Sequence, residues 1–202
     1  TPTSTGLLHT DGGRLLPAWT PNVGLYLHYD HRPLTVTRVG TGERVYDEVG
    51  RQLAMQLAAA IGVFGFGELG VVVPVVLNQS GDARPAGMGT APSLSAGAGD
   101  LRLTAKLRVW ESGALHVALA GALDLPTAGA AYSGDQGVGI EPRVNVSYAT
   151  KTMGVLGTVG TRLRSDFNPV LNGLNNTPKI GSEGKLTLGG WVNLMPEFLD
   201  AL

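Results

Sequence analysis

Between residues 99 and 111, apolar side chains alternate strictly with polar ones. The apolar positions are Leu101, Leu103, Ala105, Leu107 and Val109, and Arg102, Lys106 and Arg108 stand between them. A period of two places the two sets on opposite faces of a β-strand, whereas a helix would mix them around its circumference. The pattern predicts a strand with one apolar face and one charged face.

The same alternation recurs along most of the chain, from residue 22 to residue 195. The strands that it predicts cover residues 22–39, 51–63, 68–78, 99–111, 114–126, 137–150, 153–164 and 184–195. Pro33 interrupts the first of these, and we expect one long strand that bends or bulges there. Residues 53–61 also have helix-forming composition, but the alternation favours a strand. Residues 1–21 show little periodicity and are expected to be an irregular lead-in with Trp19 as an anchor, so that residues 22–202 form the second unit.

The connections between these strands alternate in length. Short turns are expected at 64–67, 111–113 and 150–153, and long loops at 79–98, 127–136 and 165–183. In an up-and-down meander all short turns then lie at one end, as in bacterial outer-membrane barrels. We therefore predict an all-β fold, an antiparallel up-and-down transmembrane β-barrel with about eight strands in this chain, to which a longer protein would add more.

The polar face of the strands favours a confined lumen over a water-facing surface. Only 15% of the residues are charged, against about 25% in typical soluble domains. Much of the polar face is small, at Ala54, Ala58, Ala60, Gly62, Gly70, Ala118, Ala120, Ala122, Gly139, Gly154 and Gly160. The opposite face is nearly free of charge, as lipid requires. The prediction is a location in the bacterial outer membrane, with outer-membrane lipid as a partner.

Eight charged residues on the polar faces are the candidate functional residues. They are expected to line the lumen as a pore or an ion-pair network: Glu68, Arg102, Lys106, Arg108, Glu141, Arg143, Arg162 and Lys185. Aromatic residues make up only 6% of the chain, so any aromatic girdle at the membrane boundary would be thin. This scarcity is the observation that most favours a soluble barrel or sandwich instead.

Several classes of function receive no support. The chain has no cysteine, so disulfides, thiolate metal sites and a cysteine nucleophile are excluded. A net charge of −1 with both signs scattered argues against nucleic-acid binding. Residues 28–31 (His-Tyr-Asp-His) are the best metal candidate, but they supply too few ligands for a closed site. No nucleophile elbow or phosphate-binding loop occurs, and we expect no enzyme, no metal and no cofactor.

The order of short motifs resembles the N-terminal barrel of OmpA-family outer-membrane proteins of the myxobacterial type. The motifs are GLL at 6–8, GRLLP at 13–17, GLYLHY at 24–29, PL at 33–34, ELG at 68–70, PVVLNQSG at 74–81, GDLRL at 99–103 and EPR at 141–143. The resemblance implies a precursor with a signal peptide, more than eight strands and a C-terminal periplasmic domain that grips peptidoglycan. On this basis the chain is expected to lack its last strands and that domain, and peptidoglycan and other envelope proteins are the implied partners.

The predicted function is a structural or envelope-anchoring outer-membrane barrel, with or without a narrow pore. One alternative is a porin or solute channel, which needs a wide, water-filled lumen. The other is a soluble all-β module that binds a ligand through loops 79–98 or 165–183.

Overall fold

The computed structural model describes residues 11–85, 94–130, 133–134, 137–164 and 181–193. These residues form one antiparallel sheet of eight long strands and one two-residue strand, β4 (Gly97–Ala98), which pairs only with β3. The long strands are β1 (Pro21–Thr37), β2 (Arg44–Val63), β3 (Gly67–Ser80), β5 (Leu101–Ser112), β6 (Leu115–Leu125), β7 (Gly139–Ala149), β8 (Met153–Arg164) and β9 (Glu183–Val192). Apart from β4, each strand pairs with its neighbours in chain order.

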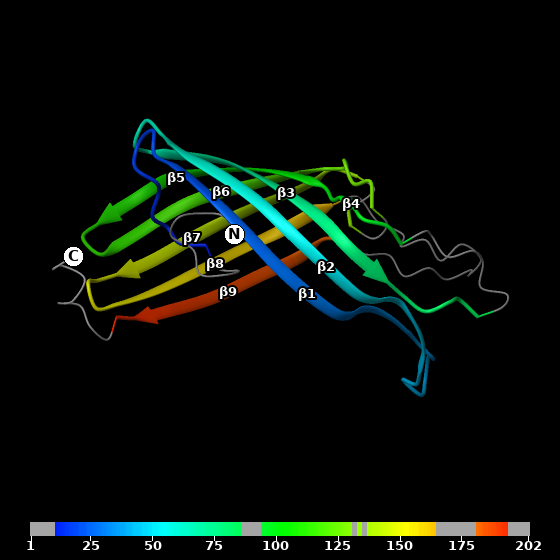
Figure 1. Ribbon diagram of the computed structural model, residues 1–202. Helices are drawn as coiled ribbons and strands as arrows, with labels where there is room; N and C mark the ends of the chain where they lie inside the picture. The colour runs from blue at the N-terminus through cyan, green and yellow to red at the C-terminus, as the bar shows by residue number, and fades with distance from the viewer. Residues whose placement is uncertain (1–10, 86–93, 131–132, 135–136, 165–180, 194–202) are drawn as a thin grey trace.

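The sheet curls into a half-barrel, in which β1 to β3 cross in front of β6 to β9 (Figure 1). The two end strands, β1 and β9, do not pair with each other in the described part of the chain. The prediction of an all-β antiparallel meander is confirmed. No helix in the described ranges is long and apolar enough to cross a membrane.

The predicted alternation of short and long connections is also confirmed. The turns between β2 and β3, between β5 and β6 and between β7 and β8 lie together at one end of the sheet (Figure 1). Two of them use left-handed backbone, at Gly65 (φ 75°) and Gly113 (φ 56°), which glycine adopts without steric cost. We call this the short-turn end, and the opposite one the loop end.

The first two strands differ in detail from the sequence prediction. β1 runs unbroken past Pro33, as expected, with a register shift between His31 and Leu34. β2 begins at Arg44 instead of residue 51. The period of two is lost there because residues 46–49 are all buried, so the sequence carries no strand signal. β1 and β2 therefore extend together beyond the loop end of the other strands (Figure 1).

The two faces of the curled sheet have opposite composition. The convex face carries large apolar side chains that are exposed, and we call this surface the apolar band. It includes Val23, Leu25, Leu27, Leu57, Ile61, Leu69, Leu103, Leu107, Leu119, Ile140, Val144, Val146, Val155, Val159, Leu163, Leu186 and Leu188. The concave face is buried or half-buried and holds alanines, glycines and most of the charged residues of the strands.

Candidate functional site

Charged side chains alternate with small ones across the concave face. Strand register places Glu68, Lys106, Ala120, Arg143, Gly160 and Lys185 in one row across β3 and β5 to β9. Ala120 and Gly160 leave space on either side of Arg143, so its long side chain can lie over the sheet. The small residues that the sequence shows on this face thus make room for the charged ones.

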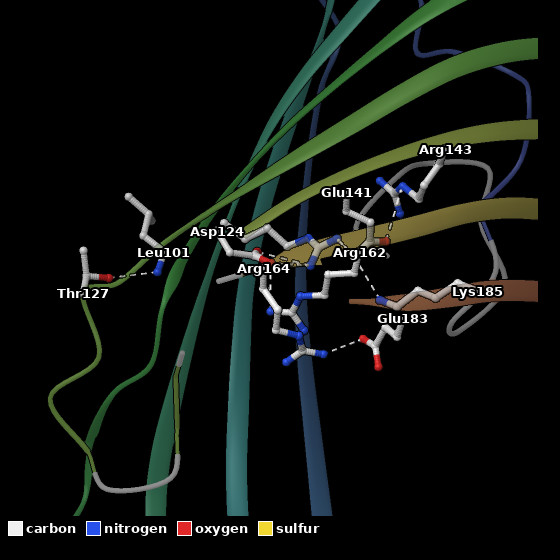
Figure 2. Close-up of polar contacts among 10 residues, drawn as sticks. Leu101, Asp124, Thr127, Glu141, Arg143, Arg162, Arg164, Glu183 and Lys185 are labelled. Carbon is white, nitrogen blue, oxygen red and sulfur yellow. Dashed lines mark hydrogen bonds and ion pairs between the residues drawn. The ribbon is translucent and has the colours of Figure 1, made fainter. Parts of the chain in front are cut away.

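Near the loop end, two buried carboxylates form ion pairs with the basic side chains of the concave face. Glu141 is 2% exposed, and its carboxylate lies 2.7 Å from Arg102, 2.9 Å from Lys185 and 3.7 Å from Arg143. Arg143 and Lys185 reach it from either side in Figure 2. Asp124 pairs with Arg102 at 3.2 Å and with Arg162 at 2.9 Å. Buried charges persist only when they are paired, so these residues form one connected network.

A segment that precedes the first strand fills the other half of the concave space. Residues 11–18, which we call the plug, lie against the concave face. The two carboxylate oxygens of Asp11 accept hydrogen bonds from Lys106 Nζ and Asn145 Nδ2, both at 3.0 Å. Thr158 Oγ1 donates to the Asp11 carbonyl, also at 3.0 Å. Asp11 is 1% exposed and therefore fastens the plug to three strands.

The rest of the plug is held largely by its backbone. Lys106 Nζ also donates to the carbonyls of Gly12 and Arg14, so all three of its protons are used. The Gly13 amide donates to Ser147 Oγ, and the Leu16 amide donates to Glu68 Oε2 at 3.0 Å. A Cβ on Gly13 would stand 2.2 Å from the His116 carbonyl oxygen, so only glycine allows so close a passage.

A cavity of about 1020 Å³ occupies the concave space beyond the plug. Asp11 lies in its lining, together with Arg102, Arg143, Arg162, Lys185 and other residues of β5 to β9. Apolar residues of β1 to β3, including Leu34, Val49, Val72 and Val76, line it as well. The cavity wall is therefore strongly charged along β5 to β9 and mostly apolar along β1 to β3, where His28, Gln52 and Gln56 also line it.

The structure brings seven of the eight predicted lumen residues onto the concave face. Glu68 and Lys106 hold the plug, and Arg102, Glu141, Arg143, Arg162 and Lys185 belong to the network. Arg108 stands apart. It lies at the short-turn end, where a register shift between Arg108 and Trp110 interrupts the ladder, and it bonds to Glu111 and the Gly65 carbonyl.

Sequence reasoning missed three acidic or basic members of this site. Asp124 lies on the polar face of β6, so the same strand alternation is the signal that could have found it. Arg164, at the end of β8, pairs with Glu183 at 2.8 Å and lines the cavity. Asp11 carried no signal of its own, although the Gly12-Gly13 pair that follows it permits close packing.

The candidate metal segment at residues 28–31 does not gather a ligand set. His28 Nε2 lies 3.8 Å from the Asp30 carboxylate, and His31 occupies the next, oppositely directed position of β1. No group of three potential metal ligands occurs among the described residues. Of the two predicted ligand-binding loops, residues 86–93 and 165–180 lie outside the described ranges.

An aromatic cluster marks the short-turn end. Trp19 meets Phe64 edge to face, with ring centroids 5.4 Å apart, and Phe64 stacks on Phe66 at 6.0 Å. All three rings are more than half exposed. The Trp19 amide donates to the Gly62 carbonyl at 2.8 Å, which fixes the point where the plug leaves the sheet. The expectation of Trp19 as an anchor fits this position.

Comparison with known proteins gives one family. No curated protein matches the sequence. A family model described as "Putative MetA-pathway of phenol degradation" matches residues 36–170, from the end of β1 to just beyond β8. This span covers about two thirds of the chain and includes most of the charged network. The chain belongs to this family.

Proposed function

We propose that this chain is a β-barrel protein of the bacterial outer membrane, with its apolar band against the lipid hydrocarbon. The observation that carries the proposal is the band itself. Within the described strands no charged side chain interrupts it, and Arg51 stands only at its outer edge, where β2 pairs with the last residue of β3. One Arg or Lys at the bilayer midplane costs about 2–4 kcal/mol.

The exposure of large apolar side chains favours a membrane barrel over a soluble module. Leu188, on the edge strand β9, is 74% exposed, and Leu119, on β6 in the middle of the sheet, is 52% exposed. Soluble monomers rarely expose contiguous apolar patches beyond a few hundred Å². In a lipid-embedded barrel the same side chains would be in their preferred solvent. The aromatic cluster at the short-turn end suits a membrane boundary, where such rings are enriched.

The concave face supports a filled barrel of structural type. The plug and the charged network occupy the interior with mutually bonded groups, as in small barrels whose side chains fill the lumen. An envelope-anchoring role of the OmpA type would add a peptidoglycan-binding domain to such a barrel, and it remains a proposal based on the motif resemblance.

Passage of a small solute is the second candidate function. The cavity of about 1020 Å³ at the loop end favours it, because the space beyond the plug is open to a ligand. The family description, which names phenol degradation, is consistent with a small aromatic solute. In this reading the plug would have to leave its place before a solute could cross.

A pair of charge substitutions tests the membrane proposal. Leu119→Arg places a charge in the apolar band, and Val39→Arg places one in the turn between β1 and β2, where Val39 is 98% exposed. If the band faces lipid, we expect Leu119→Arg to reduce the membrane-inserted fraction at least tenfold and Val39→Arg to leave it unchanged. The measurement is the amount of folded protein in outer-membrane fractions.

Both positions are exposed apolar residues, so Val39→Arg controls for the general cost of a new arginine. If both variants insert as well as the unchanged protein, or if both fail equally, the band does not face hydrocarbon.

A further inference from the structure

The cavity at the loop end contains a buried guanidinium whose bonding is incomplete. The Arg143 side chain is 5% exposed, and its ion pair with Glu141, measured from Nε, is 3.7 Å long. Nε itself is fully buried and has no hydrogen-bond partner among the described residues. Because Arg143 lines the cavity, a small shift of its side chain would bring the guanidinium donors to a ligand there. Buried donors are normally satisfied, so this arginine has capacity for one.

The ion pair with Glu141 does not occupy all the hydrogen-bond donors of Arg143. The Glu141 carboxylate is engaged more closely by Arg102 at 2.7 Å and by Lys185 at 2.9 Å. Among the described residues, the cavity lining holds five basic residues, Arg102, Arg143, Arg162, Arg164 and Lys185, and four acidic ones, Asp11, Asp100, Asp124 and Glu141. Positive charge is therefore in slight excess, which favours an anionic group.

A second buried polar group on the cavity wall also has no partner in the described part of the chain. Thr187 lines the cavity, and its buried hydroxyl oxygen forms no hydrogen bond with any described residue. Strand register places Thr187 two positions from Lys185, which shares the row of Arg143. The hydroxyl can donate to a carboxylate or accept from a hydroxyl group.

The wall contributed by β1 to β3 is mostly apolar, with His28, Gln52 and Gln56 as its polar residues. Val49, Val72 and Val76 are buried and line the same cavity, together with Pro33 and Leu34. Small-molecule sites combine apolar walls with a few convergent polar groups in volumes of about 300–1000 Å³. The cavity, at about 1020 Å³, is large enough for a ring-sized ligand.

We propose that the cavity binds a small organic anion with an apolar body, such as an aromatic carboxylate, whose anionic group pairs with Arg143. Guanidinium binds carboxylates through two parallel hydrogen bonds, which gives strength and orientation. The ring of the ligand lies against the valines of β2 and β3. The site depends only on the concave face, so it stands or falls separately from the membrane proposal.

Gly160 positions the arginine for this role. A Cβ at Gly160 would stand 2.7 Å from Arg143 Cγ and 2.6 Å from the Pro142 carbonyl oxygen. Gly160 is the cross-strand partner of Arg143, so any side chain there would push the guanidinium out of place. Gly160→Ala is therefore expected to weaken anion binding without removing the charge.

The test compares three probes on the detergent-solubilised full-length protein by titration calorimetry. Benzoate carries both the ring and the carboxylate, phenol is neutral at pH 7, and acetate lacks the ring. We expect saturable benzoate binding, with phenol and acetate at least tenfold weaker. No saturable benzoate binding would overturn the proposal, as would phenol or acetate binding as tightly as benzoate. This comparison needs no variant.

Variants then locate the site. Arg143→Gln is expected to weaken benzoate binding at least tenfold. Arg143→Lys keeps the positive charge but loses the planar guanidinium that binds a carboxylate through two hydrogen bonds, so it is expected to weaken benzoate binding severalfold. Arg108→Gln is the matched control, because Arg108 lies at the short-turn end and does not line the cavity. Unchanged benzoate affinity in both Arg143 variants would overturn the assignment, as would an equal loss in Arg108→Gln. Circular dichroism verifies that each variant is folded.

Discussion

At the scale of single residues, Lys106 illustrates why charges persist inside this sheet. The sequence shows a lysine on the polar face of a strand, beside Glu68 on the next strand. In the structure its main partner is Asp11, at 3.0 Å, with both side chains at most 3% exposed. A buried charge that loses its partner is far more costly than an exposed one. The Lys106–Asp11 pair therefore carries a large share of the contact between plug and sheet.

Removing one member of that pair should be strongly destabilising. We expect Lys106→Met to lower the free energy of unfolding by about 3–5 kcal/mol, because the buried Asp11 carboxylate loses the Lys106 ammonium that balances its charge. The double variant Asp11→Asn/Lys106→Met should recover most of the loss. Urea unfolding in detergent micelles measures both.

The matched control is Arg38→Met, which removes an ion pair with Glu43 whose side chains are both 62% exposed. Exposed pairs are worth at most about 1 kcal/mol. A loss in Lys106→Met no larger than in this control would contradict the buried pairing.

Asp47 gives the protein a pH-sensitive point outside the segments expected to lie in the membrane. Burial alone would raise the pKa of Asp47, but hydrogen bonds from Arg44 and Thr35, and the charges of Arg44 and Arg32, hold the pKa below its usual value. Asp82, which also pairs with Arg44, is the nearby acidic group. Since the folded pKa is the lower one, ionised Asp47 stabilises the hairpin of β1 and β2 above the unfolded pKa.

The hairpin should therefore be stable at neutral pH and loosen in acid. As the pH falls below about 4, the usual range of an aspartate, the stabilisation is lost progressively through the lower folded pKa. Hydrogen–deuterium exchange of residues 34–48, corrected for intrinsic rates, measures it. Asp47→Asn should exchange faster at pH 7 and show little further change in acid. An equally steep acid response in Asp47→Asn would contradict the assignment.

At the scale of elements, the strands were predictable and the plug was not. Period-two alternation survives in the sequence wherever one face is apolar and the other small or charged, as in β5 and β7. The alternation fails where both faces of a strand are buried, as at residues 46–49 of β2. The plug is held through the carbonyls of Gly12 and Arg14 and the amides of Gly13 and Leu16. Backbone contacts of this kind leave no periodic trace in the sequence.

The candidate site was likewise predictable where it depends on strand alternation, and it was not predictable where it depends on contacts between distant segments. Strand alternation places Glu141 and Arg143 on one face of β7, and cross-strand register through Gly160 puts Lys185 in the row of Arg143. It could not show that Arg108 lies where the ladder shifts, at the short-turn end. Nor could it pair Lys106 with Asp11, which lies 95 positions away in the sequence.

A single methyl group should loosen the plug. Gly13→Ala places a Cβ 2.2 Å from the His116 carbonyl oxygen and 3.2 Å from the Asn145 carbonyl oxygen. Both are backbone atoms, which cannot rotate away as a side chain could. Overpacking of this kind typically costs about 1–3 kcal/mol. We expect trypsin to cleave after Arg14 at least fivefold faster in this variant, in detergent.

Gly121→Ala serves as the control, because nothing lies within 4 Å of its added Cβ. It should leave the cleavage rate after Arg14 unchanged. Equal rates in Gly13→Ala and the unchanged protein would show that the plug is not held against β6 as described.

At the scale of the whole molecule, the half-barrel has two long free edges. In the described part of the chain, β1 and β9 each pair on one side only. Unpaired backbone groups in hydrocarbon cost several kcal/mol each, so only closed sheets span membranes. The membrane proposal therefore requires that these edges be paired in the assembled protein, either with each other or with further strands.

The most direct test of a lipid-embedded, closed barrel is the behaviour of the full-length protein from bacterial membranes on extraction and electrophoresis. We expect it to stay with the membranes after an alkaline carbonate wash, to require detergent for extraction, and to migrate differently on gels before and after boiling. A protein released without detergent, with the same migration boiled and unboiled, would contradict the account.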